Sequence, residues 1–597
     1  NLQKSIELNE NRAIYRSKLL LDEDLATRDT SLARVYEDLG FDQLAQIEAS
    51  KSLTLNPANY SAHRFLSDSY ATRPRHEIAR VSELLQAQLL QPLNINPVQP
   101  SLNETNLRMI NGFDTSTLNE YTSLFERDRT QVLISGIAGN NTTLADEIVL
   151  SGLQGPISYS LGQFHYETEG FRANNDLKHD IFNLFTQVAL TAHLNVQAEF
   201  RRRKTSMGDL SLKADGSYDN EFHSTTQQDI ARLGAHFSPS FQSDFIVSAF
   251  YSDRDEGNNV TDKGYQTEAQ HLFHTDQFNL TTGVGIYDID HQGKWALTAK
   301  EQDAYFNINV AVPENIIWTL GLGYVSFKQS KEQFLDIDQL NPKFGLQWAI
   351  TENVGLRLAS FKTLKPRLIV QQTIAPTQIA GFNQFFDAPN GTTAESQGIG
   401  LDFRFADGLY GGLEGVQRDL QIPIFNASSG VFDFFDGREK AYLGYLYWTP
   451  HPHWAIRSEY RFDRFSAEGI VNLPFDLHLF GAYQVDTNRL PLIVRYFSPS
   501  GVFGEISLTY VYQKAKIDGV PFNETGELFV GSNKFILVDT AVGYRLPKRQ
   551  GILSLEIKNL LDRNFHYEEI SSQLSPEPGN PLSIPQRLIF AKFTLNF

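Results

Sequence analysis

From residue 131 to the end of the chain, apolar and polar residues alternate with a period of two, and this pattern constrains the fold more than any other feature. Trp454, Ile456 and Tyr460, for example, alternate with Arg457 and Glu459. Residues i and i+2 share one face of a strand, so one face is apolar and the other is polar and partly charged. Such strands are typical of a soluble antiparallel sheet or of a membrane barrel whose apolar face meets lipid.

Strand number and connection length favour the barrel. The sequence predicts twenty-two strands, most of them near the length of about ten residues with which a tilted strand crosses a bilayer. Short turns alternate with long loops, as in outer-membrane barrels. We therefore predict a mainly β protein, a 22-stranded antiparallel transmembrane outer-membrane β-barrel over 131–597 with both of its ends in the periplasm. The long loops are expected at 206–227, 327–342, 363–395, 419–437, 465–486, 515–533 and 564–586.

Residues 1–91 follow a helical period instead. Segment 31–57 predicts a helix, a turn at Gly40, a second helix and a closing Asn56-Pro57. This order resembles tetratricopeptide repeats. The resemblance implies a small all-α domain in the periplasm, incomplete at its N-terminus, which docks a periplasmic protein partner. A generic helical hairpin domain is the alternative.

Residues 92–130 predict an extended linker, because they contain Pro92, Pro97 and Pro100 among many polar residues. Barrels of twenty-two strands have a plugged lumen in known transporters. We therefore expect this linker to obstruct the lumen, with help from an inward fold of the apolar loop 363–395.

Several segments of the second region resemble the barrels of TonB-dependent receptors. These segments are 341–346, 356–362 and 365–368 in the middle, and 556–562 near the end. The resemblance implies an outer-membrane barrel and a nutrient receptor. The first 130 residues do not resemble the globular plug of that family. Helical repeats placed before an outer-membrane barrel also resemble the plan of exopolysaccharide export porins.

Three functions remain open at this point. The first is an outer-membrane channel or assembly platform that moves or anchors an extracellular polymer or protein, for secretion or transport, with the repeats as its docking site. The second is a TonB-dependent-type receptor that imports a nutrient ligand. The third is a structural membrane anchor of a larger complex.

The composition of the chain limits the partners and reactions that we expect. The chain has 597 residues, a formal net charge of −18 and no cysteine, so we expect no nucleic-acid partner and no thiolate chemistry. No catalytic constellation, cofactor motif or metal-ligand spacing stands out, and the chain is not predicted to be an enzyme.

The C-terminal strand carries a separate signal. Phe593, Leu595 and Phe597 alternate up to the last residue. This resembles the strand by which the barrel-assembly machinery accepts bacterial outer-membrane proteins, so that machinery is an expected partner.

The parity of the strands assigns further side chains to a face. Arg202 and Lys204 continue the lipid-facing parity to the outer rim, where we expect them to contact lipopolysaccharide phosphates. Plain solvation of both side chains at the rim is the alternative. The opposite parity lines the lumen, either along a solute path or as an ion-paired inner wall. The residues predicted to line the lumen are Glu199, Arg201, Arg203, Arg457, Glu459, Arg461 and Asp463.

Overall fold

A computed structural model gives the arrangement of the chain. It describes residues 32–71, 73–92, 129–257, 260–275, 277–293, 296–331, 334–385, 388–426, 431–468, 482–517, 529–547, 550–569 and 583–597.

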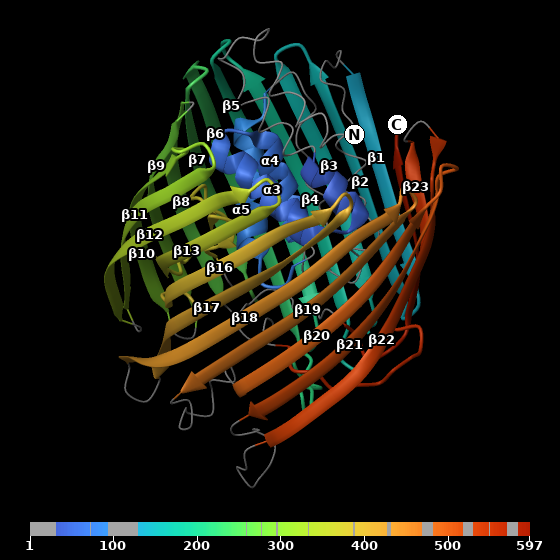
Figure 1. Ribbon diagram of the computed structural model, residues 1–597. Coiled ribbons are helices and arrows are strands. Elements are labelled where there is room, and N and C mark those ends of the chain that lie inside the picture. The colour runs from blue at the N-terminus through green and yellow to red at the C-terminus, as the bar shows by residue number, and fades with distance from the viewer. Residues whose placement is uncertain are drawn as a thin grey trace.

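Twenty-two strands form one antiparallel sheet that closes on itself, so the predicted mainly β, 22-stranded outer-membrane barrel is confirmed (Figure 1). Closure is made by the first and last strands, whose register runs from Leu133 opposite Asn596 to Gly139 opposite Phe590. Val132 and Phe597 add a reciprocal pair of backbone hydrogen bonds of 3.0 and 3.1 Å. A closed sheet leaves no unpaired strand edge, which a membrane-spanning sheet requires.

The strands of the barrel are β1 (Arg129–Gly139), β2 (Thr143–Gln154), β3 (Ile157–Thr168), β4 (Leu177–Ala189), β5 (Leu194–Met207), β6 (Ser224–Ser240), β7 (Ser243–Asp255), β8 (Thr261–His274), β9 (Phe278–Gln292), β10 (Leu297–Val310), β11 (Ile316–Lys331), β12 (Leu335–Thr351), β13 (Val354–Leu364), β16 (Thr393–Ala406), β17 (Leu409–Asn426), β18 (Val431–His451), β19 (Trp454–Glu468), β20 (Ala482–Phe497), β21 (Val502–Ile517), β22 (Phe529–Arg545), β23 (Gly551–Lys558) and β24 (Leu588–Asn596). A short hairpin of β14 (Gln378–Ile379) and β15 (Phe382–Asn383) lies between β13 and β16.

Two of the expected long loops are corrected by the structure. Within 327–342, β11 continues to Lys331 and β12 begins at Leu335. Within 419–437, β17 and β18 likewise extend as a hairpin whose register reaches Asn426 opposite Val431. The reason is that these strands project beyond the lipid, where the backbone ladder persists although outward apolar residues are no longer needed.

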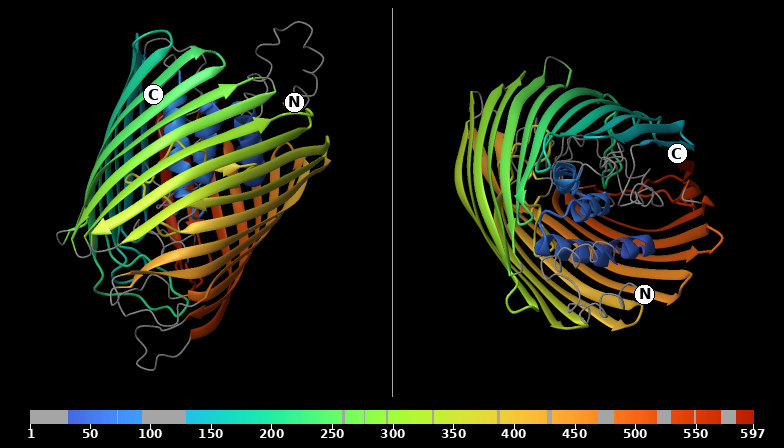
Figure 2. Two further views of the ribbon diagram at one scale, coloured as in Figure 1. Left: turned by 90° about the vertical axis from the view of Figure 1, so that its left-hand side faces the viewer. Right: turned by 90° about the horizontal axis from the view of Figure 1, so that it is seen from above.

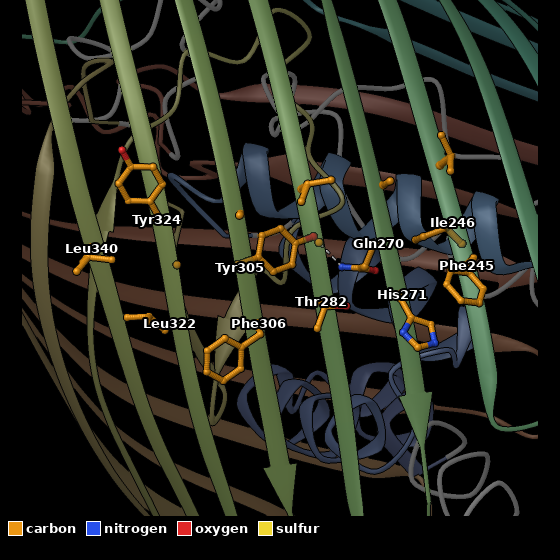
Figure 3. Close-up of a pocket in the computed structure, with 16 residues that line it drawn as sticks. Phe245, Ile246, Gln270, His271, Thr282, Tyr305, Phe306, Leu322, Tyr324 and Leu340 are labelled. Atoms are coloured by element: carbon orange, nitrogen blue, oxygen red, sulfur yellow. Dashed lines mark hydrogen bonds between the residues drawn. The ribbon is translucent and has the colours of Figure 1, made fainter.

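The outer face carries the apolar side chains that a bilayer requires. Figure 3 shows a part of this wall over β7 to β12, with a hollow of about 540 Å³ between the labelled side chains. Phe245, Phe306 and Leu340 are 41%, 44% and 59% exposed there, whereas Gln270 on the alternate parity is 3% exposed and donates a 3.0 Å hydrogen bond to Tyr305. Alternation therefore separates a lipid face from a polar lumen face.

Toward the end opposite Phe597, the outer face changes from apolar to charged. Oppositely charged residues there stand directly across neighbouring strands, an arrangement that stabilises antiparallel sheets. We call this set the rim belt. It consists of Arg202–Asp229, Lys263–Asp253, Lys300–Asp288, Lys328–Asp336, Lys362–Glu395, Arg438–Asp419 and Arg464–Asp486.

The N-terminal helices are α3 (Asp42–Leu55), α4 (Tyr60–Tyr70) and α5 (Glu77–Leu90), preceded by helical residues at 32–39. Gly40 separates the first two segments with a φ of 79°, a conformation that glycine adopts at least cost. Asn59 caps α4 by accepting hydrogen bonds from the N–H groups of Ser61 and Ala62. None of the helices in the described residues is both long and apolar enough to cross a membrane.

Candidate functional site: the closed lumen

The helices lie inside the barrel, as the view along the barrel shows (Figure 2), and in the half where the chain ends, as the side view shows (Figure 1). The short-turn side and Phe597 mark this half as periplasmic. Asn279, at the start of β9, donates hydrogen bonds of 2.6 and 2.8 Å to the carbonyls of Thr54 and Leu55 at the end of α3. The described helices, expected as a periplasmic domain, therefore contact the barrel wall within the lumen.

We call the helices α3–α5, together with the helical residues 32–39 before them, the helical unit. An aromatic contact joins this unit, next to its turn at Gly40, to the wall. The ring of Phe41 stacks on that of Tyr447 in β18, with centroids 4.8 Å apart and planes 6° apart. Tyr36 meets Tyr410 of β17 edge to face at 5.5 Å. Phe41 and Tyr447 are fully buried. Aromatic pairs of this kind add about 0.5–1.5 kcal/mol to the free energy from area burial.

Charged contacts surround this aromatic pair. Arg457 of β19 binds the Asp42 carboxylate at 2.5 Å and donates to the Gly40 carbonyl at 3.0 Å. Glu459, whose side chain is fully buried, binds Arg457 at 3.0 Å. Gly40 also approaches β20 closely, since an added Cβ would lie 2.7 Å from the Arg495 guanidinium. The turn at Gly40 is thus held between two arginines of the wall.

A second charged contact holds the connection between α4 and α5. Arg75 donates to Glu439 of β18 at 2.7 Å, and Arg418 of β17 binds the other oxygen of the same carboxylate at 2.5 Å. Close by, Gln43 donates to Glu414 at 2.8 Å. A buried carboxylate that binds two guanidinium groups is satisfied only while both partners stay in place.

Helix α5 contacts the opposite wall. Leu85 and Leu89 pack in one buried cluster with Ile246 of β7. The Gln88 carbonyl accepts a 2.6 Å hydrogen bond from Gln197 of β5, and the Gln91 side chain donates to Gln187 of β4 at 2.8 Å. The helical unit therefore reaches across the lumen from β17–β20 to β4–β7.

The loop 365–392 between β13 and β16 enters the lumen from the extracellular side; we call it the clamp loop. Its Thr373 N–H donates to the Ser82 hydroxyl of α5 at 3.1 Å, and its Thr377 hydroxyl donates to Glu83. Glu268 of β8 accepts from the Thr373 hydroxyl at 2.5 Å. The inward fold expected of this loop is present in the structure, and the loop connects the barrel wall to the helices.

Glu83 continues this connection into the helical unit. It binds His63 of α4 at 2.5 Å, and both side chains are almost completely buried. The other ring nitrogen of His63 lies 2.9 Å from the Pro57 carbonyl in the turn after α3. Buried polar contacts therefore run from the extracellular clamp loop to the α3–α4 turn near the periplasmic mouth.

A second pair of extracellular segments folds inward beside the lumen. Glu568 accepts from the Ala214 N–H at 2.8 Å, and its own N–H donates to Gln513 of β21 at 2.7 Å. Tyr567 is buried, which raises its pKa to about 12. Arg489 of β20 donates to the Tyr567 hydroxyl at 3.1 Å.

The residues predicted to line the lumen lie on the lumen side of β5 and β19. Glu199 binds Arg232 at 2.9 Å, and Arg201 and Arg203 donate to neighbouring amide oxygens at 3.3 and 3.0 Å. Arg457 and Glu459 contact the helical unit or its immediate partners, as described above. Arg461 binds Glu459 at 2.8 Å, and Asp463 is exposed toward the lumen.

The residues predicted for the outer surface lie on the outer face. Arg202 forms a bidentate pair with Asp229, and Lys204 is exposed. Phe593 and Phe597 are 40% and 68% exposed on the last strand. The predicted lumen obstruction by residues 92–130 falls almost entirely outside the described residues.

Sequence reasoning missed the residues of the helical unit that bind the wall, chiefly Asp42, Arg75 and Glu83. No spacing motif marks them. One signal was present, because Tyr445 and Tyr447 occupy the lumen parity of β18, where a water-filled lumen favours polar side chains.

Burial in this interior changes the acid–base behaviour of the helical unit. Burial and the nearby Arg461 charge lower the pKa of Arg73, which lies between α4 and α5. Burial and the Glu83 charge raise the pKa of Tyr70 well above its ordinary range.

Comparison with known proteins relates the barrel to solved structures. No protein-family profile and no curated protein sequence matches the chain. The FrpB iron transporter from Neisseria meningitidis aligns with a TM-score of 0.60 at 13% identity, over 79% of this chain and 82% of that one. The siderophore receptor PirA from Pseudomonas aeruginosa gives 0.54 at 12% identity, over 79% and 81%. The ferric-catecholate import receptor Fiu from E. coli K12 gives 0.54 at 12%, over 79% and 82%.

The barrel has the fold of the TonB-dependent receptors. The protein is accordingly one of the bacterial outer membrane. Identity near one residue in eight relates the folds alone. The neighbours are named as receptors or transporters, and none of the three is named as an enzyme. The helical unit occupies the half of the lumen in which the chain ends.

Proposed function

We propose that this protein is an outer-membrane import receptor whose gate is the helical unit α3–α5. One observation carries the proposal: the helices occupy the periplasmic half of the lumen and are bound to opposite walls by buried contacts. A gate must close a barrel of this width, since an open lumen would pass small solutes.

The alternative of a docking platform for polymer export receives less support. A docking platform needs helical surfaces that are free for a periplasmic partner. Phe41, Leu85 and Leu89 of the described helices are instead buried in apolar clusters that include residues of the barrel wall. An import function also agrees with the similar solved structures, which are named as siderophore receptors and iron transporters. Ferric chelates are therefore the first class of ligand to test.

Conductance in planar lipid bilayers tests the gate. Arg457→Glu places a third carboxylate beside Asp42 and Glu459, so we expect a channel that is closed in the native protein to open in the variant. Arg464→Glu is the matched control, because Arg464 lies on the same strand but faces outward to Asp486. Equal conductance of native protein and Arg457→Glu, with both correctly assembled, would reject the gate.

Growth tests the direction of transport. Cells that lack their own ferric-siderophore receptors would produce the protein under iron limitation, with ferric catecholates or hydroxamates supplied outside. We expect growth on at least one of these chelates with the native protein. Absence of growth on the whole panel would count against ferric chelates as the ligand.

A further inference from the structure

Three arginines meet where the α4–α5 connection faces the wall of β19 and β20; we call them the arginine cluster. Its members are Arg73, Arg461 and Arg489. Arg461 and Arg489 occupy directly opposed positions of the antiparallel register and both face the lumen. Like charges in directly opposed positions destabilise a sheet. Arg73 is close enough for the Arg461 charge to disfavour its own protonated form.

Within the described residues, the partners of these arginines use only part of their hydrogen-bonding capacity. Arg461 binds Glu459, but that carboxylate is shared with Arg457. Arg489 contacts the hydroxyl of Tyr567 and lies 5.2 Å from its ring centroid, so this partner is neutral. Arg73 donates to the neutral amide of Gln43 at 2.5 Å, and its buried Nε has no hydrogen-bond acceptor.

The carboxylates near the cluster are shared with other cations. Asp42 binds Arg457, Glu439 binds Arg75 and Arg418, and Glu459 binds both Arg457 and Arg461. Asp463 and Glu569 add negative charge near Arg489 and Tyr567, so the wider region is close to neutral. The three guanidinium groups of the cluster, and not a net charge of the region, therefore define the candidate subsite.

We propose that the arginine cluster is an anion subsite that binds an oxyanion group, a carboxylate or a phosphate, of the ligand. The fork of a guanidinium group suits both groups, because each offers two oxygens at matching spacing. Such a ligand would contact the helical unit through Arg73 and the wall through Arg461 and Arg489 at the same time. This inference rests on the proposed function, in that it assumes a ligand that enters the lumen.

Equilibrium binding to the purified full chain in detergent tests the subsite. Pyrophosphate and citrate serve as probes, and the tighter of the two assigns phosphate or carboxylate chemistry. We expect Arg489→Gln and Arg461→Gln each to weaken binding of the tighter probe by about tenfold or more, since each removes a charged fork. Arg464→Gln, which removes an outward-facing arginine from the same strand as Arg461, is expected to keep the native affinity.

Two further measurements keep the result interpretable. Heat-modifiable migration reports whether each variant is folded, and Arg489→Lys, which keeps the charge without the fork, is expected to bind with intermediate affinity. Absence of binding to folded native protein, or equal affinity in native protein and both glutamine variants, would overturn the subsite. Binding is measured without transport, so a protein that binds its probe here and fails in growth would contradict only the import of ferric chelates.

Discussion

Strand β19 contributes an arginine to two arginine–aspartate ion pairs, one in the lumen and one on the outer face of the barrel. Arg457 points into the lumen and binds Asp42, with 13% and 21% of the two side chains exposed. Arg464, on the outward parity, binds Asp486 in the rim belt with 40% of its own side chain exposed. Both pairs have N–O distances between 2.5 and 2.8 Å.

The difference lies in what happens when one partner is lost. Removing one member of a buried pair leaves an uncompensated charge and costs about 3–5 kcal/mol. Exposed pairs contribute about 0.2–1 kcal/mol, because water solvates either partner alone. The stability of the protein therefore depends on the lumen pairs, which form only while the helical unit is in place. The rim belt contributes little to stability and forms a polar boundary for the outer leaflet.

The largest effect is expected on the lumen side, from Glu459→Gln. Glu459 binds Arg457 and Arg461 and accepts a 2.6 Å hydrogen bond from the Tyr447 hydroxyl. Its neutral replacement leaves two arginines short of a counter-charge, so we expect the free energy of unfolding to fall by about 3–5 kcal/mol. Chemical denaturation in detergent measures this fall. A loss below about 1 kcal/mol, the range of exposed pairs, would remove the contrast between the two regions.

The lipid band of the outer face gives the next largest effect, through Phe593→Lys. Phe593 lies within the membrane-spanning part of β24 and its ring lies over Gly136 of β1. A lysine near the membrane midplane costs about 2–4 kcal/mol, against about 0–1 kcal/mol near the interface. Unfolding in lipid vesicles should therefore show a larger loss for Phe593→Lys than for Phe597→Lys at the chain end.

Assembly in cells separates this lipid cost from the proposed recognition of the last strand. If the barrel-assembly machinery reads the terminal aromatic residue, Phe597→Lys should lower the amount of heat-modifiable barrel in outer-membrane fractions more than Phe593→Lys does. The reverse order would mean that lipid cost alone governs the yield.

The barrel was predictable because lipid and lumen impose opposite chemistry on alternate residues. The structure has the twenty-two strands that this alternation predicts. The prediction failed at the hairpins within 327–342 and 419–437, where the outward face becomes charged while the inward face stays apolar. Lys328 and Asp336 face outward there and so break the apolar alternation, while the backbone ladder continues.

The closed lumen was predictable only in part. The apolar residues Ile379 and Phe382 indicated that the clamp loop folds inward, and both are buried. The helical period indicated helices on either side of Gly40, but it gave no partner for their apolar face. A face that packs on a periplasmic protein and one that packs on Tyr447 have the same sequence pattern, so the position of the helices required the structure.

A smaller effect is expected where the clamp loop meets α5, from Ser82→Ala. The Thr373 N–H donates to the Ser82 hydroxyl in a fully buried contact. Its loss leaves a buried donor without an acceptor, which costs about 1–3 kcal/mol. Hydrogen exchange of residues 370–378 should accelerate in the variant. Ser206→Ala, which removes an exposed contact with His223, should leave their exchange unchanged.

The smallest effect is expected in the rim belt, from Arg202→Gln. The bidentate pair with Asp229 has good geometry, at 2.6 and 2.8 Å, but 55% of the Arg202 side chain is exposed. We expect the free energy of unfolding in detergent to change by about 1 kcal/mol or less. Because Asp229 already binds Arg202, we propose that Lys204 contributes more to the contact with lipopolysaccharide phosphates. Lys204→Gln should then reduce the lipopolysaccharide that copurifies with the barrel, and Arg202→Gln should reduce it less. Equal retention by native protein and both variants would leave the rim belt with a boundary role alone.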